Sequence, residues 1–283
     1  MERLVVVILG IGLLGMSFGA PLARFLPELS AMTIAFWRML GASMVMWSSA
    51  PFKAEKPLGR DKFPLIMIAG FFLGLHFVCF YAAVKMVPIA NATLFATLAP
   101  IFTIIYERFG LKRHLPWGAV LGLWVAIAGA VIIQISGMSF NMDQALGNLV
   151  GLASSLFMSV VLIIGERIRG TTSTISYTRW LYLFAAISIG LITLASGTDM
   201  GFTLGDTKWL VGLVVLPTLL GHNSLNFAVK YLRPTIVGAT PFGEPILASI
   251  IAWFLFGETV GIYVAIGGMI TISGLIILTI NRR

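Results

Sequence analysis

Residues 241–278, PFGEPILASIIAWFLFGETVGIYVAIGGMITISGLIIL, form two apolar runs that are separated only by the short segment GET at 257–259. Each run is close to the length of about 20 apolar residues with which a helix crosses a bilayer. A spanning segment must satisfy its own backbone hydrogen bonds, and a helix does so internally. The stretch therefore predicts two membrane helices joined by a short connection.

The same alternation of apolar blocks and short polar segments extends over the rest of the chain. Hydrophobic residues make up 58% of the sequence and charged residues 11%, whereas soluble domains carry about 25% charged residues. We therefore expect an all-α integral membrane protein without a separate soluble domain. The single cysteine, Cys79, excludes an intramolecular disulfide and a cysteine-based metal cluster. We expect neither a cofactor nor a metal site.

Ten membrane spans are predicted, at residues 4–23, 31–50, 63–83, 90–109, 116–135, 145–165, 174–196, 209–229, 236–256 and 260–280. With the N-terminus in the cytoplasm, the inner segments hold fourteen Lys and Arg residues and the outer segments hold three. Because cytoplasmic loops carry such an excess, we expect a multi-pass protein of the plasma (inner) membrane with both termini cytoplasmic. The net charge of +8 then reflects topology, and no nucleic-acid partner is expected.

The chain contains an internal repeat. Four identities occur at one shift of 145 residues: Lys85 with Lys230, Pro100 with Pro245, Gly122 with Gly267, and Gly129 with Gly274. The repeat unit holds five spans, an odd number, so the two copies must cross the membrane in opposite directions. We therefore predict two inverted five-helix repeats, at 1–140 and 141–283. Secondary transporters commonly have this plan, with the substrate site near mid-membrane where the halves meet.

The stretch 241–278 resembles the end of an EamA-type unit of the drug/metabolite transporter superfamily. Glu244–Pro245, Phe256–Gly257–Glu258, Gly267 and Gly274 carry the resemblance. A weaker copy, TLAPIFTIIYERFGLKRHLPWGAVLGLWVAIAGAVII, stands at 97–133, where Ala99 replaces Glu244 and Arg113 replaces Glu258. The resemblance implies ten helices, a cavity lined mainly by spans 1, 3, 4, 6, 8 and 9, and alternating access. It implies a metabolite substrate without naming one, because the superfamily handles amino acids, nucleotide sugars, drugs and other metabolites.

Polar side chains inside the apolar spans are the candidate substrate-binding residues. Thr218, His222 and Asn226 follow one another at a spacing of four residues, which places them on one face of a helix. Polar groups in lipid need partners or water, so this face should point to the protein interior. Glu244 lies at a similar depth in the next span and should be able to meet His222. The remaining candidates are His76, Phe80, Tyr81, Asn91 and Thr97.

Glu244 is the candidate for coupling transport to protons. An ionised carboxylate at mid-membrane costs about 3 kcal/mol on insertion scales, so we expect Glu244 to take up a proton on one side and release it on the other, helped by His222. Glu244 would alternatively sense a cationic group on the substrate, or merely cap the helix break that Pro241 and Pro245 make. For His222 and His76 the structural alternative is a hydrogen bond between helices.

Two arginines also fall inside spans. Arg38 and Arg179 are related by a shift of 141 residues. Each either extends to the membrane interface or pairs with an acid or with a carboxylate-bearing substrate. Glu107 and Glu166, each followed directly by an arginine, stand at inner span ends, where we expect solvated pairs with that neighbouring arginine.

The sequence favours a secondary active transporter over other membrane proteins. It lacks the G-x-x-x-x-G-K-[ST] phosphate-binding loop, so we expect a gradient rather than ATP to supply the energy. We expect an exporter of a small polar or amphipathic metabolite, such as an amino acid or a derivative, that works by alternating access. The alternatives are a facilitative exchanger, a channel and an intramembrane enzyme. An enzyme is disfavoured because the three histidines lie far apart, without acidic neighbours at ligand spacing. The partners expected are the substrate, the bilayer and protons, and the oligomeric state stays open.

Overall fold

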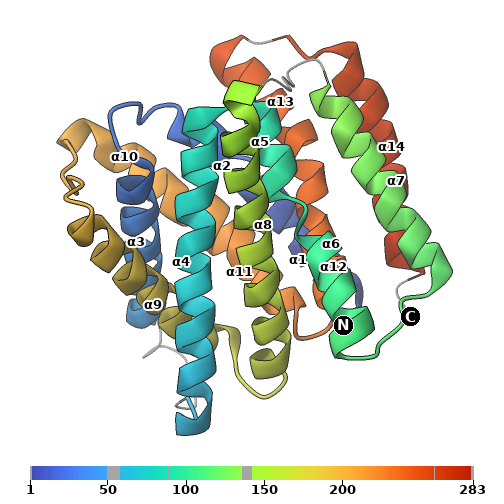
Figure 1. Ribbon diagram of the computed structural model, residues 1–283, viewed down its shortest axis with the longest axis horizontal. Coiled ribbons are helices and arrows are strands. Elements are labelled where there is room, and N and C mark those ends of the chain that lie inside the picture. Colours follow the sequence, from blue (N-terminus) through green and yellow to red (C-terminus); the bar gives the residue numbers. More distant parts are fainter. Residues whose placement is uncertain (1, 50–57, 88, 136–141, 258, 282–283) are drawn as a thin grey trace.

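The structure is a computed structural model that describes residues 2–49, 58–87, 89–135, 142–257 and 259–281. Within these ranges all regular elements are helices (Figure 1). Glu258, which contributes to the family resemblance, lies outside the described residues, as do four of the fourteen inner basic residues, namely Lys53, Lys56, Arg282 and Arg283.

The helical elements are α1 (Glu2–Met16), α2 (Gly19–Ala23), α3 (Ala31–Ser49), η2 (Arg60–Lys62), α4 (Phe63–Met86), α5 (Ile89–Ala96), α6 (Ala99–Ile105), η3 (Tyr106–Gly110), α7 (Trp117–Gln134), α8 (Met142–Arg169), α9 (Thr174–Ala195), α10 (Leu204–Leu213), η4 (Val214–His222), α11 (Asn223–Ala228), α12 (Pro234–Ala239), η5 (Thr240–Gly243), α13 (Glu244–Phe256) and α14 (Ile262–Ile280). Of the short elements, η3 and η4 are π-helical and η2 and η5 are 3₁₀-helical.

Within the described part of the chain, eight helical segments are long and apolar enough to cross a membrane: Arg3–Ala23, Arg60–Met86, Asn91–Gly110, Gln144–Arg169, Thr174–Ala195, Leu204–Ala228, Pro234–Phe256 and Ile262–Ile280. The helix α7 is apolar but shorter. The helix α3 has the length but not the apolarity, because Arg38 lowers its mean hydropathy. The chain is thus a multi-pass membrane protein, while the predicted number of ten spans exceeds what length and apolarity alone support.

Two spans are broken near their middle. The fourth predicted span consists of α5, α6 and η3, and Thr97 and Leu98 separate α5 from α6. The ninth consists of α12, η5 and α13, with Pro241 inside the 3₁₀ turn. Pro100 and Pro245 each stand near the start of the second piece, where proline is tolerated because the first turn of a helix needs no N–H donor. Breaks of this kind expose backbone at mid-membrane only where it lines a cavity.

The helices pack in a pattern that stays the same when the first five and the last five predicted spans are exchanged. The second spans of the two groups pack on each other (α3 on α9), as do the fourth spans (α6 on α12) and the fifth spans (α7 on α14). The first span of each group packs on the third of the other, because α1 contacts η4 and α11 while α8 contacts α4. Such a pattern is what a two-fold relation between the groups produces.

The helices α7 and α14 pack backbone to backbone through glycines. A Cβ atom at Gly122 would lie 2.8 Å from the carbonyl oxygen of Gly274, and one at Gly129 would lie 2.6 Å from that of Gly267. Rising residue numbers on α7 therefore meet falling numbers on α14, so the two helices are antiparallel, and Figure 1 shows them side by side at one edge of the bundle. Glycines allow this approach because they have no side chain.

Candidate functional site

A cavity of about 60 Å³ lies in the middle of the bundle, at the helix breaks. Five of the nine predicted substrate-binding residues line it: His76 and Phe80 on α4, Thr97 between α5 and α6, His222 on η4, and Glu244 at the start of α13. Met158, Leu162 and Leu225 supply apolar surface. We call this space the central cavity. Its small volume means that a metabolite would enter only if the lining opened.

Four ionisable side chains line the central cavity. His76 and His222 have ring centres 6.1 Å apart, and Glu244 and Arg38 border the same space. The guanidinium of Arg38 is near enough to interact electrostatically with Glu244 and with both imidazoles. Among the residues that the structure describes, however, neither Arg38 nor Glu244 makes a salt bridge. The cavity thus holds a cation and an acid that are not paired with each other.

Arg38 is held firmly by its neighbours. Its Nε donates to Oγ1 of Thr218 at 2.6 Å, and its Nη1 donates to the hydroxyl of Tyr81 at 2.8 Å. The guanidinium carbon lies 4.2 Å from the ring centre of Phe77, a cation–π contact. The residue is only 2% exposed, and its Nη2 is buried without a hydrogen-bond partner. Extension to the membrane interface, one of the two interpretations of the sequence, is therefore wrong for Arg38.

A proline in η4 explains why Thr218 can hold Arg38. Pro217 has no N–H and cannot make the α-helical bond to the carbonyl of Leu213, and the π-helical register brings Thr218 to this carbonyl instead. The hydroxyl of Thr218 donates to this carbonyl at 2.9 Å. Its proton is thereby committed, and its oxygen is left to accept the Nε–H of Arg38. The π-helical stretch around Pro217 thus produces a fixed acceptor deep in the bundle.

The two histidines differ in their surroundings. The Nδ1 of His76 lies 2.9 Å from both the carbonyl oxygen and the hydroxyl of Ser154 on α8. His76 thus makes the hydrogen bond between helices that its structural interpretation predicts, while also lining the cavity. His222 packs against Phe77, with ring centres 4.9 Å apart, and within the described part of the chain it has no hydrogen bond. No group of three or more metal-ligating side chains occurs among the described residues.

The other four predicted residues lie outside the cavity lining. Tyr81 and Thr218 are buried behind Arg38 and hold it. Asn226 donates to the hydroxyl of Tyr182 at 3.4 Å on α9. Asn91 donates to Oδ1 of Asn148 at 3.0 Å, between α5 and α8.

Thr218, His222 and Asn226 were predicted to share one helix face, but only His222 lines the cavity. The helix geometry explains this difference. A π-helix has more residues per turn than an α-helix, and η4 is π-helical up to His222. Residues four apart therefore do not line up across it as they would on an uninterrupted α-helix.

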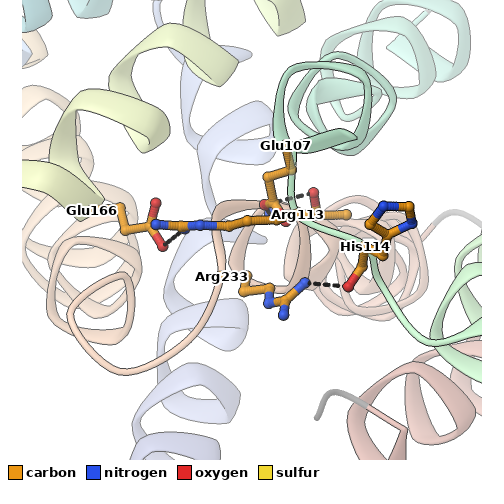
Figure 2. Close-up of polar contacts among 6 residues, drawn as sticks. Glu107, Arg113, His114, Glu166 and Arg233 are labelled. Carbon is orange, nitrogen blue, oxygen red and sulfur yellow. Dashed lines mark hydrogen bonds and ion pairs between the residues drawn. The ribbon is translucent and has the colours of Figure 1, made fainter. Parts of the chain in front are cut away.

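A second polar cluster lies where several helices end (Figure 2). Glu107, on η3, has no exposed surface, and its Oε1 accepts from the backbone N–H and from the hydroxyl of Thr235 at 3.1 and 2.9 Å. Its Oε2 is buried without a partner. The solvated pair with Arg108 that the sequence led us to expect is therefore wrong, because Glu107 faces the start of α12.

Two further hydrogen bonds, each donated by an arginine, belong to this cluster. Arg113 donates to Glu166 at the end of α8 at 2.7 Å, and Arg233 donates to the carbonyl oxygen of His114 at 2.9 Å. The expected pairing of Glu166 with Arg167 is likewise replaced by one with a residue distant in sequence. We call Glu107, Arg113, His114, Glu166, Arg233 and Thr235 the end cluster. Its side-chain contacts join residues 107–114 to residues 166–235.

Known proteins place these features in a family. The sequence profile described as the EamA-like transporter family matches residues 4–135 and again residues 145–280. The chain belongs to the EamA-like transporter family. Named relatives of this EamA-like chain include the uncharacterized transporter YdfC of Bacillus subtilis, which is 25% identical over 85% of this chain and 79% of YdfC.

Two relatives have names that state a cargo. The pseudopaline exporter CntI of Pseudomonas aeruginosa is 22% identical, over 90% of this EamA-like chain and 88% of CntI. A probable terminal-alkyne amino-acid exporter of Streptantibioticus cattleyicolor is 25% identical, over 87% of this chain and 82% of the exporter. A crystal structure with 16% sequence identity covers 100% of the chain with a TM-score of 0.83, which establishes the shared fold.

The sequence pointed to Arg38 but could not decide whether it extends to the membrane interface or pairs with an acid or a substrate carboxylate. In the EamA-like fold, Arg38 lines the central cavity, whereas Arg179, its counterpart at a shift of 141, stacks on Trp47 with 4.8 Å between guanidinium carbon and ring centre. The repeat match pointed to both and so could not distinguish them. Two aromatic side chains of α4, Phe77 and Phe80, line the cavity, while Phe71 on the same helix is 44% exposed.

Proposed function

We propose that this EamA-like transporter is a secondary active exporter of an amino acid or a similar small metabolite, with the central cavity as its substrate site. The observation that carries the proposal is the convergence of Arg38, His76, His222 and Glu244 at two helix breaks in the middle of an apolar bundle. Broken helices at the interface of two repeats are the usual substrate site of secondary transporters. The names of two relatives, one an amino-acid exporter, give the expected direction and substrate class.

The proposal includes ten membrane helices, arranged as inverted repeats at 1–140 and 141–283, in the plasma (inner) membrane with both termini cytoplasmic. The antiparallel pair of α7 and α14 supports the inversion, because these helices occupy the same position in the two repeats. The shorter α7 and the less apolar α3 become membrane helices in this arrangement because each packs on its counterpart in the other half.

Glu244, together with His222, is proposed to carry the coupling proton. Both line the central cavity, where a proton can pass between a carboxyl group and an imidazole or water. Substrate and proton would then share one space that opens to alternate sides. His76 lies beside them but is engaged with Ser154, so it is proposed to shape the site, together with Phe80 and Thr97.

Transport by the purified protein in proteoliposomes tests the proposed function. We expect preloaded L-amino acid to drive uptake of the same labelled amino acid above the rate of protein-free liposomes, and to saturate, because a carrier binds its cargo in each cycle. An imposed pH gradient should increase net transport of at least one amino acid. Absence of counterflow for every standard L-amino acid would remove the proposed substrate class.

The same assay separates the alternatives. A facilitative exchanger gives counterflow that an imposed pH gradient does not change. A channel gives flux that does not saturate and that is not accelerated by substrate on the opposite side. Only the combination of saturation, counterflow and acceleration by the pH gradient agrees with the coupled carrier.

The end cluster is proposed to close the cytoplasmic end of the substrate path. In the proposed topology its residues lie at the cytoplasmic ends of spans 4, 6 and 9, and its contacts join the two halves. These contacts must separate when the cavity opens to that side. The side chains of Arg113 and Glu166 are 44% and 23% exposed, and pairs so exposed contribute only about 0.2–1 kcal/mol. Their effect on closure should accordingly be modest.

Reversing the charge of Arg113 is expected to favour the state that is open to the cytoplasm. Arg113→Glu places a carboxylate beside Glu166, and we expect up to about fivefold faster labelling of the central cavity from the cytoplasmic side. The reporter is Leu162→Cys in a Cys79→Ala background, labelled with an impermeant maleimide in inside-out vesicles. Lys112→Glu, the same change at an exposed neighbouring residue, is the matched control.

The double variant Arg113→Glu with Glu166→Arg restores the pair in reverse and should return the labelling rate to that of the parent. Equal labelling rates in the parent, the single reversal and the Lys112→Glu control would exclude a closing role for the end cluster.

A further inference from the structure

We infer that Arg38 binds a carboxylate of the substrate, which restricts the cargo to small molecules that carry a free carboxylate, such as amino acids. The inference rests on the proposed function and narrows its substrate class. Among the described residues, Arg38 is the one buried guanidinium or ammonium group that lines the cavity, and its Nη2 has no hydrogen-bond partner.

The hydrogen bonds of Arg38 show which part of the guanidinium is available. Nε and Nη1 are bound to Thr218 and Tyr81, whereas Nη2 is buried without a partner. Buried polar groups are almost always hydrogen-bonded, so an orphaned, charged donor requires an explanation. Because Arg38 lines the central cavity, a group that enters the cavity can supply the missing acceptor.

The chemistry of that acceptor follows from charge and geometry. A guanidinium is planar and always charged, and its fork of N–H groups matches the two oxygens of a carboxylate. Among the described residues no acid forms a salt bridge with Arg38, although Glu244 lines the same cavity. The protein therefore keeps a desolvated cation that forms no salt bridge with a carboxylate of the described residues, and a substrate carboxylate would complete the site.

The guanidinium is also oriented in advance. Thr218 is itself fixed by its bond to the carbonyl of Leu213, and the ring of Phe77 covers one face of the guanidinium at 4.2 Å. Binding would then require little ordering of the side chain, which favours affinity. Lysine would keep the charge but would lose the fork and the contacts with Thr218 and Tyr81. The apolar side chains of Met158, Leu162 and Leu225 are suited to the remainder of a small amphipathic molecule.

Paired probes on the unaltered protein give the first test. The standard L-amino acids and the corresponding L-amino-acid amides, which lack only the carboxylate, are compared by thermal unfolding of the detergent-purified chain. A ligand raises the apparent stability by mass action. We expect at least one acid to stabilise the protein and its amide to bind about tenfold or more weakly, as loss of a charged hydrogen bond predicts. Equal binding of acid and amide overturns the inference.

Variants give the second test. Arg38→Gln should lose binding of the stabilising amino acid by about tenfold or more, and Arg38→Lys should recover only part of it. Arg179→Gln, at the equivalent arginine outside the cavity, should bind as the parent does. An Arg38→Gln protein that binds the acid normally overturns the inference. If the protein transports amines or amides but no acids, it is still an exporter, but the carboxylate site is excluded. If it transports none of these compounds, the proposed function itself is excluded.

Discussion

Glu244→Gln is expected to abolish the acceleration of transport by a pH gradient while counterflow continues. Glutamine keeps the shape and hydrogen-bonding capacity of a protonated carboxyl group but cannot take up or release a proton. If Glu244 carries the coupling proton, net transport loses its driving force, whereas exchange of substrate for substrate needs no net proton movement. Glu244 and His222 line the same central cavity, so the change is made where substrate and proton are proposed to meet.

The measurement compares net transport with and without a pH gradient, and counterflow at equal pH, in proteoliposomes. We expect complete loss of the gradient effect and a change in the half-saturating concentration for counterflow within about threefold. Glu28→Gln, the same substitution at an exposed residue, is the control and should behave as the parent. Retained acceleration by the gradient would exclude Glu244 as the coupling residue, and a large loss of affinity with coupling intact would instead indicate that Glu244 senses a cationic group.

Gly122→Leu is expected to disrupt the contact between α7 and α14 and to cause the largest loss of stability among these predictions. A Cβ atom at Gly122 would lie 2.3 Å from the backbone nitrogen of Leu278. A backbone atom cannot move aside without shifting its helix, so α14 must be displaced. Overpacking of this kind costs typically 1–3 kcal/mol, and we expect about 3 kcal/mol because the obstacle is the main chain.

Thermal unfolding in detergent measures this effect. A loss of about 3 kcal/mol corresponds to a fall in Tm of roughly 6–12 °C for a chain of this size. Gly10→Leu is the matched control, because a Cβ at Gly10 has no atom within 4 Å and the residue is exposed. Equal Tm values for the two leucine variants would mean that α7 and α14 do not approach each other as the structure describes.

Much of the architecture could be predicted from the sequence. Burial of apolar segments in lipid depends on local composition, so the apolar blocks gave nearly the observed bounds, as for 4–23 against Arg3–Ala23 and 174–196 against Thr174–Ala195. The repeat pointed to Gly122, Gly129, Gly267 and Gly274, and at these residues the backbones of α7 and α14 meet. Glycine spacing is a local property, and its consequence for packing is direct.

The candidate site could be predicted only in part. Glu244, His222, His76, Phe80 and Thr97 meet at the cavity because residues near the middle of spans tend to meet near the middle of a bundle. Asn226 and Asn91 instead bind neighbouring helices. Depth along a span can be read from the sequence, but the direction of a side chain around the helix axis cannot be read once a π-helical turn changes the register.

The sequence by itself determined that the chain is a membrane protein of helical spans, that it contains a repeat, and that ionisable groups lie inside its apolar segments. The tertiary structure decided which of these groups share a space. It placed Arg38 in the cavity and Arg179 on Trp47, and it joined Glu107 to Thr235 rather than to an adjacent arginine. The reason is physical, because apolarity and length act locally, whereas the partners of a buried charge depend on how helices distant in sequence rotate and pack against one another.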